Sequence, residues 1–407
     1  MASKCFPNPF RPGAGHPPPY LAGREEEKSD CRKLLRQEVI LENMVLTGLR
    51  GTGKTVLLDT FKPMAISEQW MWAGTDLSES ASISEENIAH RLLTDLAMVT
   101  SGIVIYNDSK QGVGFSTDEE VIPIPLSYAL LIDIYNDTPG LVSDKLKRTL
   151  ETAWKYLQNR NINGLVFAYD EAQNLSDQAA KEEYPCSLLL DVFQSLQKKG
   201  YPFLLILTGL PTLFPKLVKA RTYAERMFHV IELDRLNKKA CEEAILKPVE
   251  ESGCPLVLNE EAVETIYKLS GGYPYFIQFI CREVYDAFIQ KHNEGEPASV
   301  PVEEIIHKLD ADFFSGRWAR ATDRQRELLI LISSLENCDS EFSVAQISEI
   351  SETMSSKPFS SSNTLQMFNT LIDAGLLFKN RHGRYSFAVP LLGEFIKRQF
   401  NPDMFLD

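Results

Sequence analysis

The sequence has no uninterrupted apolar run that approaches the roughly 20 residues needed to span a bilayer. It therefore predicts a chain that does not cross a membrane. Residues 1–11 contain few apolar side chains and are followed by prolines, a composition unlike that of a secretory signal peptide. We expect a cytoplasmic protein.

Cysteine and histidine are scarce and scattered. None of the seven cysteines forms a CxxC pair, and the six histidines include no HExxH pattern. A zinc site built from protein ligands is therefore not expected. An odd number of dispersed cysteines suits a reducing compartment in which thiols serve as small core residues.

Basic residues are outnumbered by acidic ones. The chain has 42 Lys and Arg against 56 Asp and Glu, a net charge of −14. This balance excludes a protein that coats nucleic acid by bulk charge, although it leaves room for a local basic patch. With 407 residues, 44% of them hydrophobic, the chain is typical of a globular protein of about two or three domains.

The most informative pattern is a glycine-rich loop that follows an apolar stretch. Residues 45–47 read as a strand, and Gly48-x-x-x-x-Gly53-Lys54-Thr55 matches a complete phosphate-binding loop that opens a helix. The glycines let backbone N–H groups face a polyphosphate at the helix N-terminus. Lys54 can bridge the β- and γ-phosphates, and the Thr55 hydroxyl can bind Mg²⁺.

These residues predict bound ATP and Mg²⁺, with nucleotide contacts from Gly48, Arg50, Gly51, Thr52, Gly53, Lys54, Thr55 and Val56. Arg50 occupies a variable position of the loop, where we expect it to be solvated or ion-paired. GTP is disfavoured because no NKxD sequence is present.

An acidic pair follows a second apolar run. Residues 164–169 suit a central parallel strand buried on both faces, and Asp170-Glu171 stands at its end. We expect Asp170 to hold Mg²⁺ through water and Glu171 to polarise the attacking water, which implies hydrolysis and not binding alone. The alternative is a pair of solvated acids at a strand end.

Three further residues are candidates for the same reaction. Thr208 ends the next strand and could contact the γ-phosphate or the water, or simply lie in a turn. Arg221 and Arg226 precede the last core strand, where an arginine could act as a finger on a neighbouring subunit's γ-phosphate. Either could equally be an exposed surface arginine.

The order of elements predicts an α/β class. Strand patterns at 70–76, 164–169, 203–207 and 229–233 alternate with helical patterns at 83–99, 141–157 and 187–198. Such alternation is typical of a doubly wound parallel sheet. Residues 103–125 interrupt it, and we interpret them as a hairpin-like insertion.

Helices replace strands after Leu236. Three are expected at 238–251, 260–269 and 275–291, and three more precede a short hairpin at the C-terminus. This final order is the outline of a winged helix. We predict that Leu365, Phe368 and Ile372 form the inner stripe of its third helix, with Thr364 among the outward residues.

The resulting division has four parts: an N-terminal arm over the nucleotide site (1–30), the α/β nucleotide-binding core (31–236, with its insertion at about 103–125), a helical lid (237–316) and a winged helix (317–407).

The chain resembles the AAA+ P-loop ATPases of the origin-initiator-type and archaeal-type branch, which borders on the STAND signalling NTPases. The segments that carry the resemblance, which covers nearly the whole chain, are Asn8–Phe10, Pro17–Pro19, Leu21–Glu25, Gly48–Thr55, Asp170–Gln173, Thr208–Pro211, Ala224–Phe228 and Gly271–Pro274.

This resemblance implies that the arm and the lid flank the adenine, with Pro9, Phe10 and Pro274 near the base. It also implies self-association driven by ATP. One departure is the absence of a sensor arginine at the start of the lid helix, where Tyr273-Pro274 stands and the nearest arginine is Arg282.

The sequence leaves the partner open. Lys379, Arg381 and Arg384 form a basic wing that could contact DNA, which favours a switch acting on DNA. The acidic net charge favours the alternative, a STAND-like signalling or anti-phage defence NTPase whose winged helix contacts a protein effector. A nucleotide-binding scaffold without turnover is disfavoured by Glu171.

Overall fold

The computed structural model describes residues 6–13, 15–107, 122–294, 300–336, 338–355, 357–381 and 383–400. The chain forms two compact units. One consists of Glu25–Thr47 and Leu57–Glu232, and the other of Met1–Arg24, Gly48–Val56 and Leu233–Asp407.

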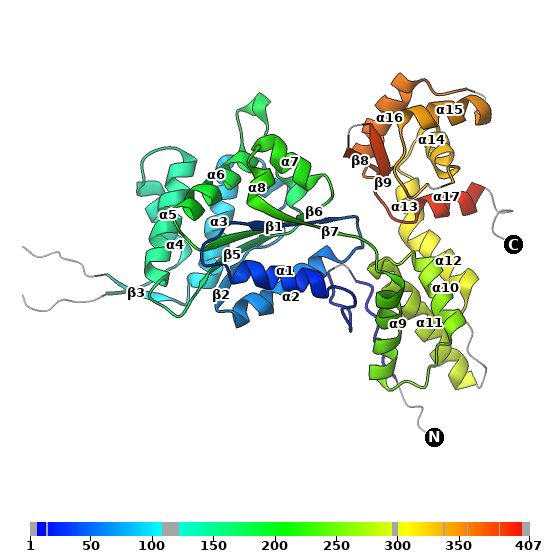
Figure 1. Ribbon diagram of the computed structural model, residues 1–407, viewed down its shortest axis with the longest axis horizontal. Helices are drawn as coiled ribbons and strands as arrows, with labels where there is room; N and C mark the ends of the chain where they lie inside the picture. The colour runs from blue at the N-terminus through cyan, green and yellow to red at the C-terminus, as the bar shows by residue number, and fades with distance from the viewer. Residues whose placement is uncertain are drawn as a thin grey trace, which may run out of the picture. The chain divides into compact units, whose positions relative to one another are not determined.

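A five-stranded sheet with the order β2-β5-β6-β1-β7 is the centre of the first unit (Figure 1). The strands are β1 (Asn43–Gly48), β2 (Trp70–Ala73), β5 (Gly164–Tyr169), β6 (Phe203–Gly209) and β7 (Phe228–Leu233). β1 and β6, β6 and β5, and β5 and β2 pair in parallel. Because the carboxyl ends of parallel strands share an edge, the segments that follow β1, β5 and β6 all leave the sheet at that edge.

Every residue of β1, β5 and β6 is buried. This explains why the three strands appear in the sequence as continuous apolar runs and not as alternating ones. Phe167 on β5 packs edge-to-face against Phe193 and Phe203, with ring centroids 5.3 and 6.0 Å apart.

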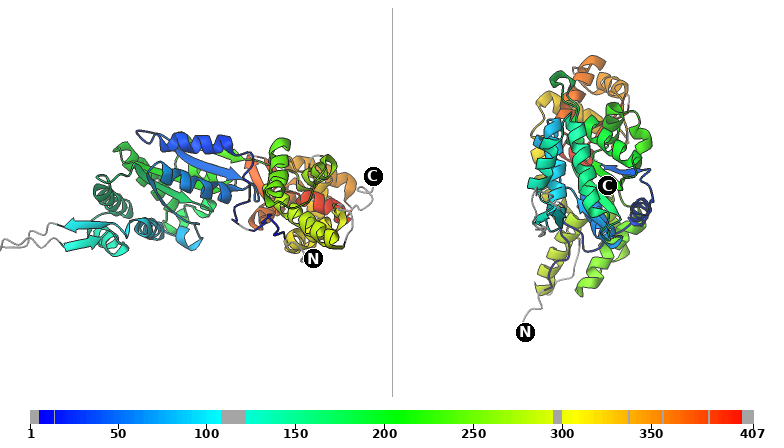
Figure 2. Two further views of the ribbon diagram at one scale, coloured as in Figure 1. Left: turned by 90° about the horizontal axis from the view of Figure 1, so that it is seen from below. Right: turned by 90° about the vertical axis from the view of Figure 1, so that its left-hand side faces the viewer.

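Helices cover both faces of this sheet, α1 and α2 on one side and α3, α5 and α6 on the other (Figures 1 and 2). The predicted doubly wound α/β architecture is thereby confirmed. The helices are α1 (Glu25–Leu35), α2 (Lys54–Ser67), α3 (Glu85–Thr100), α4 (Tyr128–Asp137), α5 (Val142–Leu157), α6 (Pro185–Lys198), α7 (Leu213–Ala220) and α8 (Ala224–Met227), with short 3₁₀ turns η1 (Ser80–Ser82), η2 (Ala172–Asn174) and η3 (Ala179–Lys181).

The predicted insertion is a hairpin in its described part. β3 (Val104–Asn107) pairs antiparallel with β4 (Ile122–Pro125), and residues 108–121 lie outside the described ranges. Helix α4, which follows the hairpin, was not predicted. It buries Leu131 and Tyr135 and packs on α3 and α5.

The other unit begins with the predicted lid helices, α9 (Lys238–Ser252), α10 (Glu260–Ser270) and α11 (Pro274–Glu294), which pack on one another (Figure 1). The side chains of Asn237 and Asn259 accept hydrogen bonds from Ala240 N and Ala262 N, so both residues are N-caps. α12 (Val302–Leu309), a single π-helical turn η4 (Asp310–Phe314) and α13 (Ser315–Trp318) follow.

The C-terminal elements have the order expected of a winged helix. They are α14 (Asp323–Ser333), α15 (Val344–Met354), α16 (Ser361–Asp373), β8 (Leu377–Arg381), β9 (Arg384–Phe387) and α17 (Leu392–Phe400). α14 and α15 each begin with a capping box, formed by Thr322 with Gln325 and by Ser343 with Gln346. α17 is tied to η4 by an ion pair between Arg398 and Asp310 of 2.5 Å.

The predicted inner stripe of α16 is right at Phe368 and wrong at Leu365, and Thr364, predicted to face outward, is buried. Thr364, Phe368 and Leu371 are buried, whereas Leu365 is 45% exposed. Residues 364, 368 and 371 share the spacing of one helix face just as well as 365, 368 and 372 do. Packing thus selects a stripe that contains a threonine and leaves a leucine on the surface.

A buried amide pair fixes β1 in the sheet. Asn43 is fully buried, and its Oδ1 accepts hydrogen bonds of 2.8 Å from both Gln197 Nε2 and Leu205 N. Its Nδ2 donates to Gln197 Oε1 and to Met227 O at 3.2 and 3.3 Å. One side chain thereby joins the start of β1 to α6, β6 and the segment before β7.

We predict that Asn43→Ala lowers the free energy of unfolding by about 2–4 kcal/mol, because it leaves the Leu205 N–H and the Gln197 amide unsatisfied in the core. The matched control is Asn163→Ala, which removes a single exposed hydrogen bond to Glu68 O. The control should cost less than about 1 kcal/mol. Equal losses in urea unfolding would contradict the role assigned to the amide pair.

Candidate nucleotide site

The glycine-rich loop lies between β1, which ends at Gly48, and α2, which begins at Lys54. This is the strand–loop–helix context that the sequence predicts. Gly51 and Gly53 have φ angles of 83° and 89°, in the left-handed region that favours glycine. A Cβ on Gly53 would have no heavy atom within 4 Å, so its backbone conformation and not a lack of space calls for glycine.

Lys54 is folded back over this loop. Its Nζ donates to the carbonyl oxygens of Gly48 and Leu49, at 2.9 Å each, and Thr52 Oγ1 also donates to Leu49 O. The ammonium is therefore held beside the N-terminus of α2, where backbone N–H groups favour an anion. This arrangement suits a polyphosphate.

Arg24 anchors the loop from the N-terminal segment, a role that the sequence analysis did not assign. It is 6% exposed, and its guanidinium donates to Thr52 O at 3.1 Å and to Asp234 O at 2.8 Å. The carbonyl contacts hold the loop against the residue that follows β7. The only sequence signal for this role was the position of Arg24 inside the Leu21–Glu25 segment.

Helix α11 contacts both the loop and the N-terminal arm. Tyr275 N, in the first turn of α11, donates to Gly51 O at 3.2 Å. Phe10 is 3% exposed and packs edge-to-face on Tyr285, while Asn8 Nδ2 donates to Arg282 O and Asp286 Oδ1. Pro9 and Pro274 are half-buried. The arm is thus fixed to α11, and Phe10 contributes to the lid core.

Arg50 is exposed and faces the C-terminal elements. Its Nη1 lies 3.6 Å from the point where a Cβ on Gly375 would be. Burial lowers the pKa of Arg317 on α13, and the charges of Arg50 and Arg320 lower this pKa further. Arg317 is held over the Phe313 ring at 4.1 Å from its centroid. Arg50 and Arg320 are thus close enough to Arg317 for their charges to lower its pKa.

Asp170 and Glu171 follow β5 as predicted. Asp170 is 4% exposed, and its Oδ1 accepts a 2.8 Å hydrogen bond from Glu171 N. Glu171 is exposed and has a φ of 52°. A left-handed glutamate costs free energy, and such residues gather at functional sites.

Thr208 lies one residue before the end of β6. It is fully buried, and its Oγ1 has no hydrogen-bond partner among the described residues. An unpaired buried hydroxyl is costly, so it calls for a ligand or a buried water. Thr208 lies at the shared edge of the sheet, and its contact with the γ-phosphate or the water stays a prediction.

The two candidate finger arginines have different surroundings. Arg221 makes a bidentate ion pair with Asp191, at 2.8 and 2.6 Å, and donates to Ser187 Oγ at 2.7 Å. Arg226, on α8, is exposed and has neither an ion pair nor a hydrogen bond from its side chain to any residue that the structure describes. Only Arg226 is thus available for another subunit.

The residues present fit Mg²⁺ in one respect. Within the described ranges no group of three or more His, Cys, Asp or Glu could hold a metal ion alone. Mg²⁺ is usually bound by one or two protein oxygens together with substrate phosphates. Thr55 and Asp170 provide a hydroxyl and a carboxylate of that kind.

The basic wing is partly described. Lys379 on β8 is exposed, and Arg384 on β9 is half-buried with its Nη1 3.4 Å from Gln346 Oε1. Arg381 ends β8 opposite Arg384, and its side chain is outside the described part. α16 carries no Lys or Arg.

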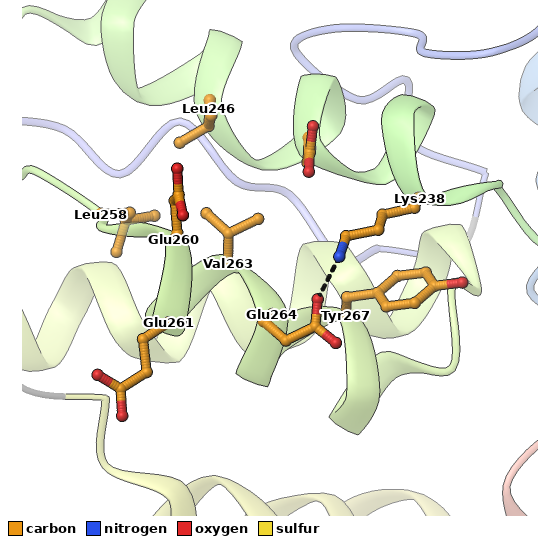
Figure 3. A pocket seen from close by; sticks show the side chains of 9 residues that line it. Lys238, Leu246, Leu258, Glu260, Glu261, Val263, Glu264 and Tyr267 are labelled. Atoms are coloured by element: carbon orange, nitrogen blue, oxygen red, sulfur yellow. Dashed lines mark ion pairs between the residues drawn. The ribbon is translucent and has the colours of Figure 1, made fainter.

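A separate hollow of about 570 Å³ lies on α9 and α10 (Figure 3). It is lined by several glutamates, one of which, Glu264, pairs with Lys238 at 2.8 Å. None of the predicted site residues lines it.

Among the described helices, none is long and apolar enough to cross a membrane.

A family model described as "Domain of unknown function (DUF8462)" matches residues 311–396. No curated protein sequence matches the chain.

Solved structures match nearly the whole chain. The Walker-type ATPase PABY2304 of Pyrococcus abyssi matches with a TM-score of 0.58 and 15% identity, over 93% of this chain and 96% of that one. The Orc2 protein of Aeropyrum pernix in its ADP form matches with a TM-score of 0.53 and 13% identity, over 97% and 98%. The chain therefore has the fold of these two proteins, which agrees with the predicted α/β nucleotide-binding architecture.

We predict that Arg221→Ala lowers the free energy of unfolding by about 1 kcal/mol, since its bidentate ion pair is partly exposed to solvent. Arg226→Ala should change it by less than about 0.5 kcal/mol. Thermal unfolding of the two variants checks this, and a larger loss for Arg226→Ala would show that the assignment is reversed.

Proposed function

We propose that the chain is an ATPase switch that binds Mg²⁺·ATP at the glycine-rich loop and hydrolyses it. The observation that carries the proposal is the sheet order. β1, which leads into the loop, and β5, which leads into Asp170-Glu171, run parallel with only β6 between them. The phosphate-binding and acidic segments therefore leave the same edge of one sheet.

The roles follow from the chemistry of each group. Lys54 and the backbone N–H groups of residues 51–56 bind the phosphates, and Thr55 and Asp170 hold Mg²⁺. The metal, when bound, neutralises charge that develops on the phosphates. Glu171 accepts a proton from the attacking water, and Thr208 donates to the γ-phosphate or orients that water.

The comparison proteins support nucleotide binding. PABY2304 is a Walker-type ATPase. The Orc2 protein was also solved as ADPNP–ADP complexes, and this chain matches that structure with a TM-score of 0.52. The fold likeness makes an adenine nucleotide the first ligand to test. We assign its base to the region of Pro9, Phe10 and Pro274, because Arg11 N, next to this part of the arm, donates to Gln278 Oε1 in the second turn of α11.

We predict that Lys54→Ala abolishes ATP binding in calorimetry, because it removes the cation of the loop. Unchanged affinity of Lys54→Ala for ATP would refute the site assignment.

The Glu171→Gln variant should still bind ATP but lose turnover by about 10²–10⁴-fold, the usual contribution of a positioned base. Full turnover of Glu171→Gln would show that Glu171 is only a strand-end acid.

We propose further that ATP promotes self-association and that Arg226 reaches the γ-phosphate of a neighbouring subunit. Arg226→Ala should lower turnover by up to about 10³-fold without weakening ATP binding to the monomer. Glu225→Ala, on the same short helix, is the matched control. Turnover per subunit that does not depend on protein concentration would exclude a finger supplied by a neighbour.

The cargo proposed first is DNA, contacted by Lys379, Arg381 and Arg384 of the wing. Because α16 lacks the Lys or Arg that reads guanine in the major groove, this binding should tolerate sequence changes. With three phosphate contacts, log K against log[salt] should have a slope of about −3 per winged helix.

Fluorescence anisotropy with ATP and the Glu171→Gln protein measures this slope at low salt. Lys379→Glu should weaken binding and Lys379→Glu with Arg384→Glu should abolish it. Lys357→Glu, at a lysine in the loop before α16, is the charge-matched control for the single substitution. Binding that survives the wing substitutions would contradict the assignment.

A protein effector is the second candidate. Leu365 on α16 is 45% exposed, and the outward face of that helix carries no cation, which suits a protein surface better than a phosphate backbone. The net charge of −14 points the same way. Absence of binding to single- and double-stranded DNA in the anisotropy experiment would select this candidate.

A further inference from the structure

The segment after β5 contains a glutamine that contacts the proposed catalytic base. Gln173 lies in η2, two residues after Glu171, and its Nε2 donates to Glu171 Oε2. Its Oε1 accepts a hydrogen bond of 3.1 Å from Leu210 N, just beyond the end of β6. One amide therefore joins the carboxylate to the neighbouring strand.

The orientation of this amide follows from its partners. Leu210 N–H is a donor, so the group that faces it must be the amide oxygen. The NH₂ group is then directed at the carboxylate, which is an acceptor. The flipped amide would set oxygen against oxygen on one side and N–H against N–H on the other, so one orientation alone satisfies both contacts.

Hydrogen bonds also hold the backbone of Gln173 and the residue that follows it. Lys216 Nζ on α7 donates to Gln173 O at 2.7 Å, and Asn174 Nδ2 donates to Leu77 O at 2.7 Å. A Cβ on Gly209 would lie 2.6 Å from Gln173 Oε1, so the close approach of the amide to β6 requires glycine there.

Glu171 needs such support more than a regular strand residue does. It is exposed and has a left-handed φ of 52°, so little packing limits its side-chain rotamers. A general base must be held in line with the proton that it accepts, and misplacement by about 1 Å can cost about 100-fold in rate.

We infer that Gln173 is the positioning residue of the hydrolysis reaction: it orients the Glu171 carboxylate by one hydrogen bond and registers it against the end of β6, where Thr208 lies. The inference rests on the proposed function, since it gives Gln173 no role apart from the base. We assign Gln173 no contact with the nucleotide, so that it acts only through Glu171.

The test replaces the amide by a side chain of similar length that cannot hydrogen-bond. Gln173→Met in the full-length chain should lower kcat by about 10- to 100-fold and leave the KM for ATP within about twofold. Gln178→Met, in the same connecting segment, has no side-chain hydrogen bond in the described structure and is the matched control. Thermal unfolding confirms that both variants fold.

A second measurement separates positioning from a structural role. In the Glu171→Gln background, single-turnover phosphate release should fall no further when Gln173→Met is added, because the group through which Gln173 acts is already lost. An equal fold loss in both backgrounds would overturn the inference. So would wild-type or raised kcat in Gln173→Met, the latter because it would reveal a restraining contact.

The experiments distinguish failure of the role inferred for Gln173 from failure of the proposed ATPase function. If the wild-type chain hydrolyses ATP and Gln173→Met does so at the same rate, the inference fails and the proposed function stands. If the wild-type chain binds ATP but releases no phosphate at any protein concentration, both fail together.

Discussion

The position of β1 between β6 and β7 is the constraint on which the proposed site depends, and a buried amide pair enforces it. Asn43 and Gln197 bond reciprocally, and Asn43 also takes the Leu205 N–H and donates to Met227 O. A register shift of β1 would break several of these bonds at once and leave buried donors and acceptors unsatisfied. The start of the phosphate loop is thereby fixed relative to the ends of β5 and β6.

At the carboxyl ends of the strands, two residues have features that lower the stability of the folded chain. Glu171 adopts a left-handed backbone, and the Thr208 hydroxyl is buried without a partner among the described residues. Both features are unfavourable in isolation, and both lie at the end of a strand next to β1 or one strand further, at the edge that carries the loop. Stability is thus concentrated in the middle of the sheet and relaxed at the edge where ATP chemistry is proposed.

The sequence predicted the sheet, the lid helices and the loop because each is encoded locally, by apolar runs, caps and glycine spacing. It could not predict the roles of Arg24 and Gln173. Their hydrogen-bond partners, Thr52, Asp234 and Leu210, lie at least 28 residues away in the sequence, and only the folded chain brings them together. The stripe of α16 was displaced because a threonine and a leucine at adjacent positions fit the helical period equally well, and only packing decides between them. The assignment of ATP, Mg²⁺ and the finger arginine stays a prediction.

The most direct test is a structure of the chain with a non-hydrolysable ATP analogue and Mg²⁺. The account predicts phosphate oxygens within about 3 Å of Lys54 Nζ and of the loop N–H groups. It also predicts the metal on the Thr55 hydroxyl, and the Glu171 carboxylate no more than one water from the γ-phosphate. An analogue bound away from residues 48–56, or a Glu171 carboxylate that faces away from the γ-phosphate, would contradict it.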